Sequence, residues 1–588
     1  MVFIRFKLNF FRAGCYHSAR HVTRKVRILP NSANQRYDVI VVGSGASGGW
    51  ACKRLAEAGL KVALLEAGRP QSDSNFTEHK PAFTLKYRNM ASELIRKTRL
   101  VQSVFDVCNE YTADWFANDL EEPYTTPKDQ PFLWMGRVRM TGGRTNVWGR
   151  VSLRFSDLDF KSASDDGFGE DWPLGYADIA PYYDLVEKYV GICGSKDGLQ
   201  YLPDGQFQPP MPLTCQERIF CDSVKEKTGR PVIPTRSANL TRPLPGRGAC
   251  HFCGPCERGC MTHSYFNSAF TTIPDAIRSG NCTLISNAMA YKVLMDSAQN
   301  RAKGVLYIDR NTKQPHEIYA RIVILCAQTQ ESTRILLNST TREYPNGLAN
   351  SSGVLGHYFT AHVRSAGGSG EFPSTAKPTL GGPKKPVGIY VPRFRNLPGQ
   401  TPAKGFLRGY GYEGESGTDF NWGAPGFGEA YKKALLEPRA RLEITGFGEV
   451  LPRWENFLEL DASVKDIYGI PVLRIHIADS ENETAMIKDI GESAGEMLEA
   501  AGAKNIHTYA QPSAPRWALH EAGTARMGSD PKKSVLNQFQ QSHDVKNLFV
   551  MDASGFTSNP CQNPTLTIMT LCVRSCDHLM DSMKKNEI

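Results

Sequence analysis

The chain has 588 residues, of which 41% are hydrophobic and 22% are charged, with a formal net charge of +9 at pH 7. These values are those of an ordinary globular protein that is long enough for more than one domain. Eight basic residues precede the first acidic residue, Asp38, so most of the positive excess belongs to a tail and gives no indication of a nucleic-acid-binding surface. No run of about 18 apolar residues predicts a membrane-spanning helix.

Residues 1–35 form this basic tail, which is rich in Arg and contains no acid. Basic residues alternate with Phe, Val and Leu as in a transit peptide, whereas the apolar run and cleavage site of a secretory signal are missing. A disordered tail, or translation from an upstream start, would have the same composition. The localisation stays unknown: the tail is compatible with a targeting peptide, and with a cytoplasmic or periplasmic location through a partner.

A dinucleotide-binding motif follows the tail. Residues 37–42 are typical of a buried parallel strand, a glycine-rich turn and a helical pattern come next, and a second strand ends in an acid. The glycines of such a motif permit a tight turn, close approach of a pyrophosphate and helix–strand packing, and the acid holds ribose hydroxyls. NAD and FAD both fit; a single copy of the motif near the start of the fold favours one permanently bound dinucleotide. The predicted contacts are Gly43, Gly45, Ala46, Ser47, Gly48 and Glu66.

A second glycine-rich segment covers residues 136–149. Its paired glycines, beside hydroxyl and amide side chains, suit a backbone that passes close to a phosphate or an isoalloxazine ring, although an ordinary loop can have this composition. The predicted cofactor contacts in it are Gly142, Gly143 and Asn146.

A cluster of cysteines has the spacing C-x2-C-x2-C-x3-C, which is that of ferredoxin-type iron–sulfur ligands. It is too compact for a structural zinc site made of two separated ligand pairs. Met261 stands where a proline usually follows, and the fourth cysteine of such a run normally serves a second cluster, of which the sequence shows no sign. A single cluster could use three of these cysteines with a remote ligand, or be a three-iron type. Reduced thiols or a disulfide that braces a loop are the alternatives. The predicted ligands are Cys250, Cys253, Cys256 and Cys260.

Two polar residues near the end of the chain are the candidate catalytic pair. A neutral imidazole, with an unperturbed pKa of about 6.5, can take the proton from an alcohol, and we assign this role to His520. Asn563 can donate a hydrogen bond to the oxygen as negative charge develops. Asn563 also has the position of an N-cap, with Pro564 as the first residue of a helix that continues to residue 573. Taken alone, either residue could be structural. His357 and His362 could line the substrate wall, although a structural role is favoured for both.

Four segments together resemble the glucose-methanol-choline (GMC) flavoprotein oxidoreductases, over most of the chain after the tail. The motif of His520 followed by Asn563-Pro564-Thr565 is most similar to pyranose 2-oxidase and the bacterial sugar and gluconate dehydrogenases. The resemblance implies FAD. Val147 stands near the place where some relatives attach flavin to a histidine, so we expect noncovalent FAD. The four segments are 37–68, 140–150, 326–339 and 520–570, and the predicted FAD contacts in the later parts of the chain are Val293, Asp552, Ala553, Asn563, Pro564 and Thr565.

The resemblance further implies an α/β fold, α+β overall, in which a Rossmann-like FAD-binding domain is interleaved with an antiparallel-sheet substrate domain. Alternating apolar residues at 441–445 and 472–476 agree with antiparallel strands in the second domain. The predicted segments are 36–150, 263–360 and 515–588 for the FAD-binding domain, 250–262 for the cysteine cluster, and 151–249 and 361–514 for the substrate domain.

The predicted function is FAD-dependent oxidation of an alcohol group of a sugar, glycoside or polyol to a carbonyl, by His-assisted proton removal and hydride transfer to flavin N5. Electrons would pass to an external acceptor, a quinone, a cytochrome or oxygen; the cysteine cluster favours a dehydrogenase over an oxidase. Relatives of the dehydrogenase type also imply a small partner subunit. The alternatives are a choline- or sterol-like alcohol oxidase, a non-catalytic flavin-bearing electron-transfer subunit and an NAD enzyme.

Overall fold

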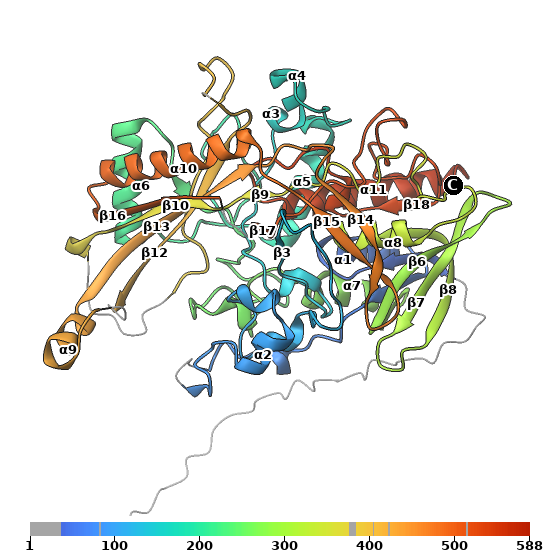
Figure 1. Ribbon diagram of the computed structural model, residues 1–588, viewed down its shortest axis with the longest axis horizontal. Coiled ribbons are helices and arrows are strands. Elements are labelled where there is room, and N and C mark those ends of the chain that lie inside the picture. The colour runs from blue at the N-terminus through green and yellow to red at the C-terminus, as the bar shows by residue number, and fades with distance from the viewer. Residues whose placement is uncertain (1–36, 81–83, 376–383, 404, 421–423, 513–515) are drawn as a thin grey trace, which may run out of the picture. The chain divides into compact units, whose positions relative to one another are not determined.

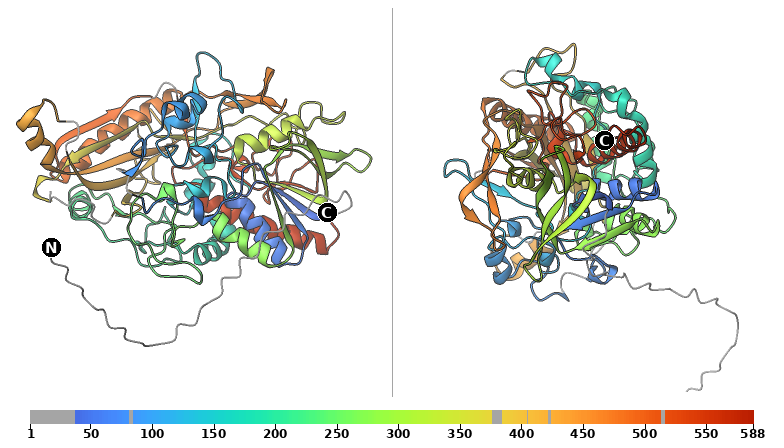
Figure 2. Two further views of the ribbon diagram at one scale, coloured as in Figure 1. Left: turned by 90° about the horizontal axis from the view of Figure 1, so that it is seen from below. Right: turned by 90° about the vertical axis from the view of Figure 1, so that its right-hand side faces the viewer.

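The computed structural model describes residues 37–588 except 81–83, 376–383, 404, 421–423 and 513–515, so the predictions for the tail lie outside the described residues. The described part of the chain contains two seven-stranded sheets and two small two-stranded sheets (Figure 1). Figure 2 shows the same elements from two further sides. Within these residues, none of the helices has the length and apolar character needed to cross a membrane.

The first sheet has the strand order β5-β2-β1-β8-β7-β6, and β18 pairs with β8. Its half around β1 is parallel, whereas β6, β7 and β8 are antiparallel. β1 can lie in the interior because its residues from Val39 to Val42 are buried and apolar, as expected for a strand covered on both faces. The strands are β1 (Tyr37–Val42), β2 (Val62–Glu66), β5 (Cys282–Ser286), β6 (Ala288–Asp296), β7 (Arg301–Asp309), β8 (Pro315–Leu325) and β18 (Leu548–Val550).

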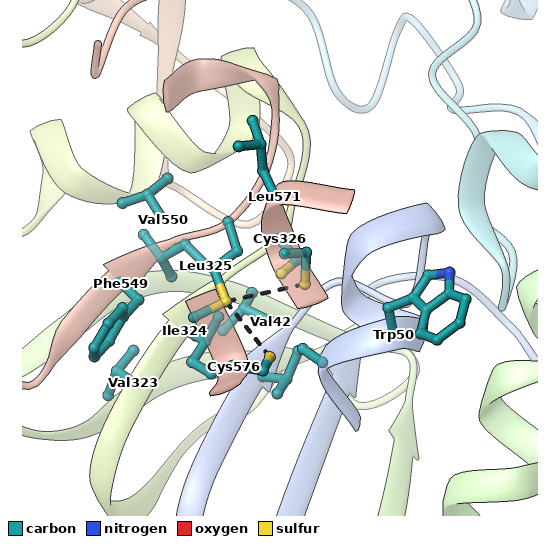
Figure 3. Packing of buried hydrophobic residues seen from close by; sticks show 14 of the residues in the cluster. Val42, Trp50, Val323, Ile324, Leu325, Cys326, Phe549, Val550, Leu571 and Cys576 are labelled. Carbon is teal, nitrogen blue, oxygen red and sulfur yellow. Dashed lines mark hydrogen bonds between the residues drawn. The ribbon is translucent and has the colours of Figure 1, made fainter. Parts of the chain in front are cut away.

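Helices cover this sheet and form the largest core. α1 (Ala46–Glu57) packs against α11 (Thr565–Lys584) and α7 (Thr272–Arg278). Figure 3 shows Leu571 and Cys576 of α11 beside strand residues such as Ile324. Residues from both ends of the described chain therefore share one core. The other helices near it are α5 (Tyr176–Val190), which packs on α11, and α8 (Thr329–Asn338), which packs on β6.

The second sheet is antiparallel, with the order β16-β10-β13-β12-β11-β4 and β9 paired with β13. Alternate residues of β13, among them Leu442 and Ile444, are buried, as the two-residue period of a strand requires. α10 (Glu481–Ala500) packs on β10, β16 and β13, and α6 (Cys215–Thr228) packs on α10. The strands are β4 (Ile233–Pro234), β9 (His362–Val363), β10 (Ala366–Glu371), β11 (Ile389–Val391), β12 (Tyr410–Phe420), β13 (Pro438–Glu449) and β16 (Lys504–Ala510).

Shorter elements connect the two sheets. β3 (Phe132–Trp134) pairs with β17 (Arg516–Ala518), and β14 (Phe457–Lys465) pairs with β15 (Pro471–His476). The remaining α-helices of the described part are α2 (Glu93–Thr98), α3 (Asp157–Phe160), α4 (Ser162–Asp166) and α9 (Gly428–Leu436).

The predicted fold class is confirmed, since a parallel-rich sheet is combined with an antiparallel one. One predicted strand has a different partner: residues 472–476 pair with β14 instead of joining the large antiparallel sheet. The interleaved segment boundaries stay a prediction.

Candidate active site

A cavity of about 620 Å³ lies where the parallel strands of the first sheet end. Its lining includes Gly43 after β1, Glu66 at the end of β2, Cys326 after β8 and Asp552 after β18. The carboxyl ends of parallel strands are where open α/β sheets bind ligands. The same cavity also reaches Glu413 of β12, so both sheets contribute to its wall.

The turn between β1 and α1 contains glycines at points where its backbone lies too close to other backbone atoms for a side chain. Gly43 has φ +97°, and a Cβ added to it would lie 2.4 Å from the carbonyl oxygen of Cys326. A Cβ on Gly48 would lie 1.8 Å from the carbonyl oxygen of Gly43, so only glycine lets α1 begin here. By contrast, a Cβ on Gly45 would meet no atom within 4 Å, although Gly45 lines the cavity. The turn thus leaves open space beside the start of α1, where a pyrophosphate is held in dinucleotide-binding folds.

Glu66 is held in place at the end of β2. Its carboxylate accepts hydrogen bonds from the backbone N–H groups of Ser44 (3.1 Å) and Gly68 (2.6 Å), and from the Ser44 hydroxyl. The Ser44 hydroxyl also accepts from the N–H of Gly142 at 2.9 Å, which joins the two glycine-rich segments. Burial raises the pKa of Glu66, and these hydrogen bonds oppose the shift. A carboxylate so placed can accept from a ribose hydroxyl pair.

The second glycine-rich segment forms a tight turn next to the first segment. Gly142 has φ +97° and is followed by a single 3₁₀ turn, Gly143–Asn146. The buried Asn146 amide donates to the carbonyl oxygens of Thr141 (3.1 Å) and Gly143 (2.8 Å), which braces the turn. Gly143 and Val147 line the cavity, whereas Gly142 and Asn146 shape the turn from behind.

Most of the predicted cofactor contacts meet at this cavity. Gly48, Gly142, Asn146 and Val293 do not line it. Val293 is buried in β6, where the lining residues are Ala288, Met289 and Ala290. The predicted contacts that line the cavity are Gly43, Gly45, Ala46, Ser47, Glu66, Gly143, Asp552, Ala553, Asn563, Pro564 and Thr565.

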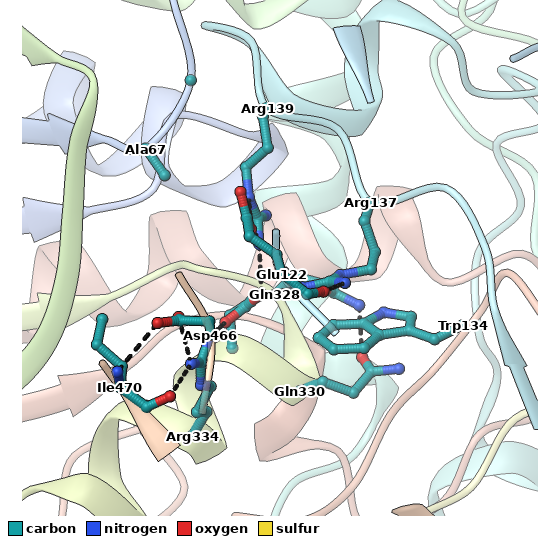
Figure 4. A network of polar contacts seen from close by, with 12 residues as sticks. Ala67, Glu122, Trp134, Arg137, Arg139, Gln328, Gln330, Arg334, Asp466 and Ile470 are labelled. Atoms are coloured by element: carbon teal, nitrogen blue, oxygen red, sulfur yellow. Dashed lines mark hydrogen bonds and ion pairs between the residues drawn. The ribbon is translucent and has the colours of Figure 1, made fainter. Parts of the chain in front are cut away.

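Buried ion pairs support the cavity wall formed by Arg137 and Arg139 (Figure 4). Arg139 lies 2.7 Å from a carboxylate oxygen of Glu122 and 2.5 Å from one of Glu331. Burial alone would raise the pKa of Glu331, but Arg139 and the neighbouring arginines outweigh it and hold that pKa at about 2. Each buried charge is therefore paired, as a rigid wall requires.

His520, the predicted base, follows β17 and is joined to a second buried histidine of β9. Nδ1 of His520 lies 2.9 Å from Nδ1 of His362, and Nε2 of His362 lies 2.7 Å from the carbonyl oxygen of Pro560. A carbonyl oxygen only accepts, so Nε2 of His362 carries the proton. Neutral His362 then accepts at Nδ1, and His520 donates from Nδ1. Nε2 of His520, a cavity-lining residue, is thereby left unprotonated.

The electrostatic surroundings keep both rings neutral. Burial lowers the pKa of His362 from 6.5 to about 4. Burial also lowers the pKa of His520 well below 6.5, with His362, Arg364 and Arg144 acting in the same direction. A neutral imidazole whose free nitrogen borders the cavity is able to accept a proton.

Asn563 reaches across to the second sheet. Its amide donates to a carboxylate oxygen of Glu413 at 2.8 Å, and its own carbonyl oxygen is buried without a hydrogen-bond partner among the described residues. The N-cap prediction is wrong: α11 begins at Thr565 after Pro564, and Asn563 makes no side-chain cap. Freed from the helix end, the amide keeps its second hydrogen for another acceptor.

The predicted iron–sulfur site is not supported. Over the described residues, no group of three or more His, Cys, Asp or Glu side chains is placed to hold a metal ion. Cys253 is exposed, whereas Cys256 and Cys260 are buried and pack with Tyr265. The predicted ligands Cys250, Cys253, Cys256 and Cys260 are free cysteines.

Three side chains of this site escaped prediction from the sequence or received another role. His362 was assigned a structural role, and Arg364 and Glu413 were not singled out. All three lie in or beside strands whose alternation marks a sheet but does not say which face borders the cofactor cavity. An antiparallel bridge between Thr360 and Ala522 brings the segment of His362 next to that of His520, and β9 in turn pairs with β13.

Models of the GMC oxidoreductase family match residues 37–364 and 452–572. The chain belongs to this family, and it is a GMC-type FAD-dependent oxidoreductase that acts on CH–OH groups. Family membership implies FAD, and the glycine turn, Glu66 and the open space at Gly45 fit that cofactor.

Several relatives match nearly the whole chain, and their names mention different alcohol substrates. 2-Methyl-1,2-propanediol dehydrogenase of Mycolicibacterium austroafricanum is 30% identical, over 94% of this chain and 96% of that protein. The fructose dehydrogenase large subunit of Gluconobacter japonicus is 27% identical, over 93% and 98%. Gluconate 2-dehydrogenase flavoprotein of Pantoea cypripedii is 26% identical, over 94% and 95%.

A similar fold is found in a solved structure, pyridoxine 4-oxidase from Mesorbium loti. The TM-score is 0.58 at 15% identity, covering 93% of this chain and 99% of that one. At this identity the likeness concerns the fold alone.

Proposed function

We propose that the protein oxidises a secondary or primary alcohol group of a sugar, glycoside or polyol to a carbonyl. The observation that carries the proposal is the His520–His362–Pro560 chain of hydrogen bonds, which leaves an unprotonated imidazole nitrogen at the cavity. The names of two relatives, fructose dehydrogenase and gluconate 2-dehydrogenase, support a polyhydroxylated substrate.

The two predicted catalytic residues have complementary roles in this proposal. His520 takes the hydroxyl proton at Nε2, and its Nδ1–H stays bonded to His362. Asn563 offers the second hydrogen of its amide to the substrate oxygen, while Glu413 holds the first. Donors fixed in advance stabilise the charge that develops on the oxygen.

The cavity side of the first sheet would hold FAD noncovalently, through the Gly43–Gly48 turn, Glu66 and the backbone near Gly143. Val147 lines the cavity at the place matching the attachment residue of covalent relatives, and it offers no nucleophile. When bound, FAD supplies the acceptor for the hydride that leaves the carbinol carbon.

Electrons would leave for an external acceptor, a quinone, a cytochrome or oxygen, and we propose a small partner subunit. One relative is named as a large subunit, which supports an assembly. A run of exposed apolar side chains at residues 90–120 also supports a contact surface. Leu100 and Leu120 lie in segments that are joined by hydrogen bonds. The exposed residues are Met90, Leu94, Leu100, Val104 and Leu120.

Anaerobic flavin bleaching tests the proposed function. The purified protein, mixed without oxygen with sugars, glycosides, polyols and choline, should lose its absorbance near ~450 nm with a polyhydroxylated substrate. Reoxidation by a quinone or by oxygen then separates a dehydrogenase from an oxidase. The His520→Ala variant should be slower by about 10²- to 10⁴-fold. His543→Ala is the matched control, since His543 lies outside the cavity lining and bonds Ser534. Bleaching by no alcohol, or by His520→Ala at the wild-type rate, would contradict the proposal.

A further inference from the structure

Arg364 is a cavity-lining cation that no step of the proposed oxidation uses. It follows β9, two residues after His362, and borders the cavity together with His520 and Asn563. Two aromatic rings hold its guanidinium group: the guanidinium carbon lies 4.6 Å from the ring centre of Phe447 and 4.8 Å from that of Trp517. Arginine stacks well on such faces, which leaves the edge with its N–H donors for a ligand.

No partner satisfies these donors among the described residues. No hydrogen bond and no ion pair within 4.0 Å joins Arg364 to any of them, and its Nε is buried without a partner. Burial lowers the pKa of Arg364, yet a guanidinium group stays charged in proteins. A buried charge that lacks a hydrogen-bonded partner is costly, and structures normally supply that partner. The partner expected here is a group that enters the cavity.

Glu413 does not fill this place. Its carboxylate accepts from the Asn563 amide at 2.8 Å, and burial raises its pKa although Arg364 and Asn563 oppose the shift. Asp106 and Glu257 also line the cavity, and neither forms an ion pair with Arg364. Glu413, Asp106 and Glu257 therefore leave the guanidinium edge unpaired.

The guanidinium group of Arg364 and the ring of His520 both lie against the ring of Phe447. Phe447, on which Arg364 lies, also stacks with His520, with ring centres 5.8 Å apart and planes inclined by 30°. An anion at Arg364 would thus be part of the same small molecule that presents its hydroxyl group to His520. Carboxylate and phosphate are the anions whose oxygens match a guanidinium fork, and of the two a sugar acid carries a carboxylate.

We propose that Arg364 binds the carboxylate of the substrate, which is therefore a hydroxy or polyhydroxy carboxylic acid. This inference rests on the proposed function, because it takes His520 as the place where the hydroxyl group reacts. It narrows the substrate class from sugars and polyols to their acids.

The test compares D-gluconate with D-sorbitol, which carries a CH₂OH group in place of the carboxylate. With the FAD-loaded wild type, gluconate should have the higher kcat/KM for anaerobic bleaching. Arg364→Met should lower kcat/KM for gluconate about 10- to 100-fold more than for sorbitol, through KM, and Arg364→Lys should recover part of the loss. Arg526→Met is the matched control. Arg526 also stacks on a ring, Tyr358 at 3.6 Å, but does not line the cavity. Equal losses for both substrates, or a wild type that prefers sorbitol, would overturn the proposal.

A second measurement tests binding alone, so it needs neither turnover nor a variant that could fail to fold. Glutarate, which has two carboxylates and no hydroxyl group, is titrated into the oxidised holoenzyme and followed by calorimetry and by tryptophan fluorescence. Saturable binding that competes with gluconate supports the anion site, even if no alcohol bleaches the flavin and the proposed function fails. Absence of binding up to millimolar glutarate in the folded holoenzyme would overturn it.

Discussion

The two walls of the cavity are built in different ways. On the wall that we propose for the cofactor (the cofactor wall), the glycine turn and its acid belong to one motif: Ser44 bonds Glu66, 22 residues away, and Glu66 bonds Gly68, with one added bond from Gly142, 98 residues from Ser44. On the catalytic wall, the partners are far apart: His362 and His520 are separated by 158 residues, and Asn563 and Glu413 by 150. The cofactor wall is therefore a local motif, whereas the catalytic wall depends on the docking of one sheet on the other.

This difference determines which substitutions we expect each wall to tolerate. The cofactor wall depends on backbone geometry, so the smallest added atom disrupts it. The catalytic wall depends on donors and acceptors, so a side chain of another shape but the same hydrogen-bonding polarity can serve.

The largest effect is expected from Gly48→Ala. The new Cβ would lie 1.8 Å from the carbonyl oxygen of Gly43, and both atoms belong to backbone that cannot move aside. We expect a protein without flavin and destabilised by at least about 3 kcal/mol, as in severe overpacking. The measurements are absorbance near ~450 nm per chain and the unfolding midpoint.

Gly45→Ala is the matched control for this prediction. Its Cβ would project into open space, with no atom within 4 Å, on the cavity side of the turn. The apoprotein should keep its stability, and only FAD affinity should fall. A Gly48→Ala protein that retains full flavin would show that the turn is not the tight cofactor seat described.

A smaller effect, on rate alone, is expected at His362. Phe at this position cannot accept from Nδ1–H of His520, so the base loses its fixed tautomer, and flavin reduction should slow at least about tenfold. Gln can accept with its oxygen and donate to Pro560 with its amide, so His362→Gln should restore most of the rate. The measurement is stopped-flow reduction of both variants across pH. Equal rates for Phe and Gln would rule out the tautomer role.

The last effect concerns stability against acid and is nearly absent at neutral pH. The pKa of His362 is about 4 in the folded protein and 6.5 in its usual range, so between these pH values the unfolded chain binds more protons. Stability is complete above pH 6.5 and falls as the pH drops, by on the order of 3 kcal/mol for this residue once the pH is below 4. His362→Gln, which does not titrate, should flatten this dependence in denaturant melts at pH 4 to 7. An unchanged slope would mean that the ring is already charged in the folded protein.

The sequence predicted the cofactor wall because its logic is local. Strand, glycine turn, helix and terminal acid follow one another, and each has a signature in a few residues. The two-sheet fold and the strand before Asp552 could also be predicted from the sequence, partly through the family resemblance.

Only some residues of the catalytic wall could be predicted from the sequence. His520 and Asn563 carried a motif, but their partners lie far away in the sequence, His362 in β9 and Glu413 in β12, and no short motif encodes these pairings. Asn563 was mistaken for a helix cap because composition cannot tell a cap from a side chain that turns away. The cysteine spacing gives only the order of possible ligands along the chain, and over the described residues no group of three or more such side chains is placed to hold a metal ion.

The packing of α11 on α1 has a consequence for biosynthesis. Arg54 of α1 lies 2.5 Å from Asp577 of α11, and the two helices share the core that backs the glycine turn. A ribosome makes the glycine turn among the first of the described residues and the covering helix among the last. The core behind the glycine turn is therefore complete only when α11 has been made, and we expect flavin to bind after that point. Truncated products would emerge colourless, so the yellow colour of a preparation reports chains that were finished.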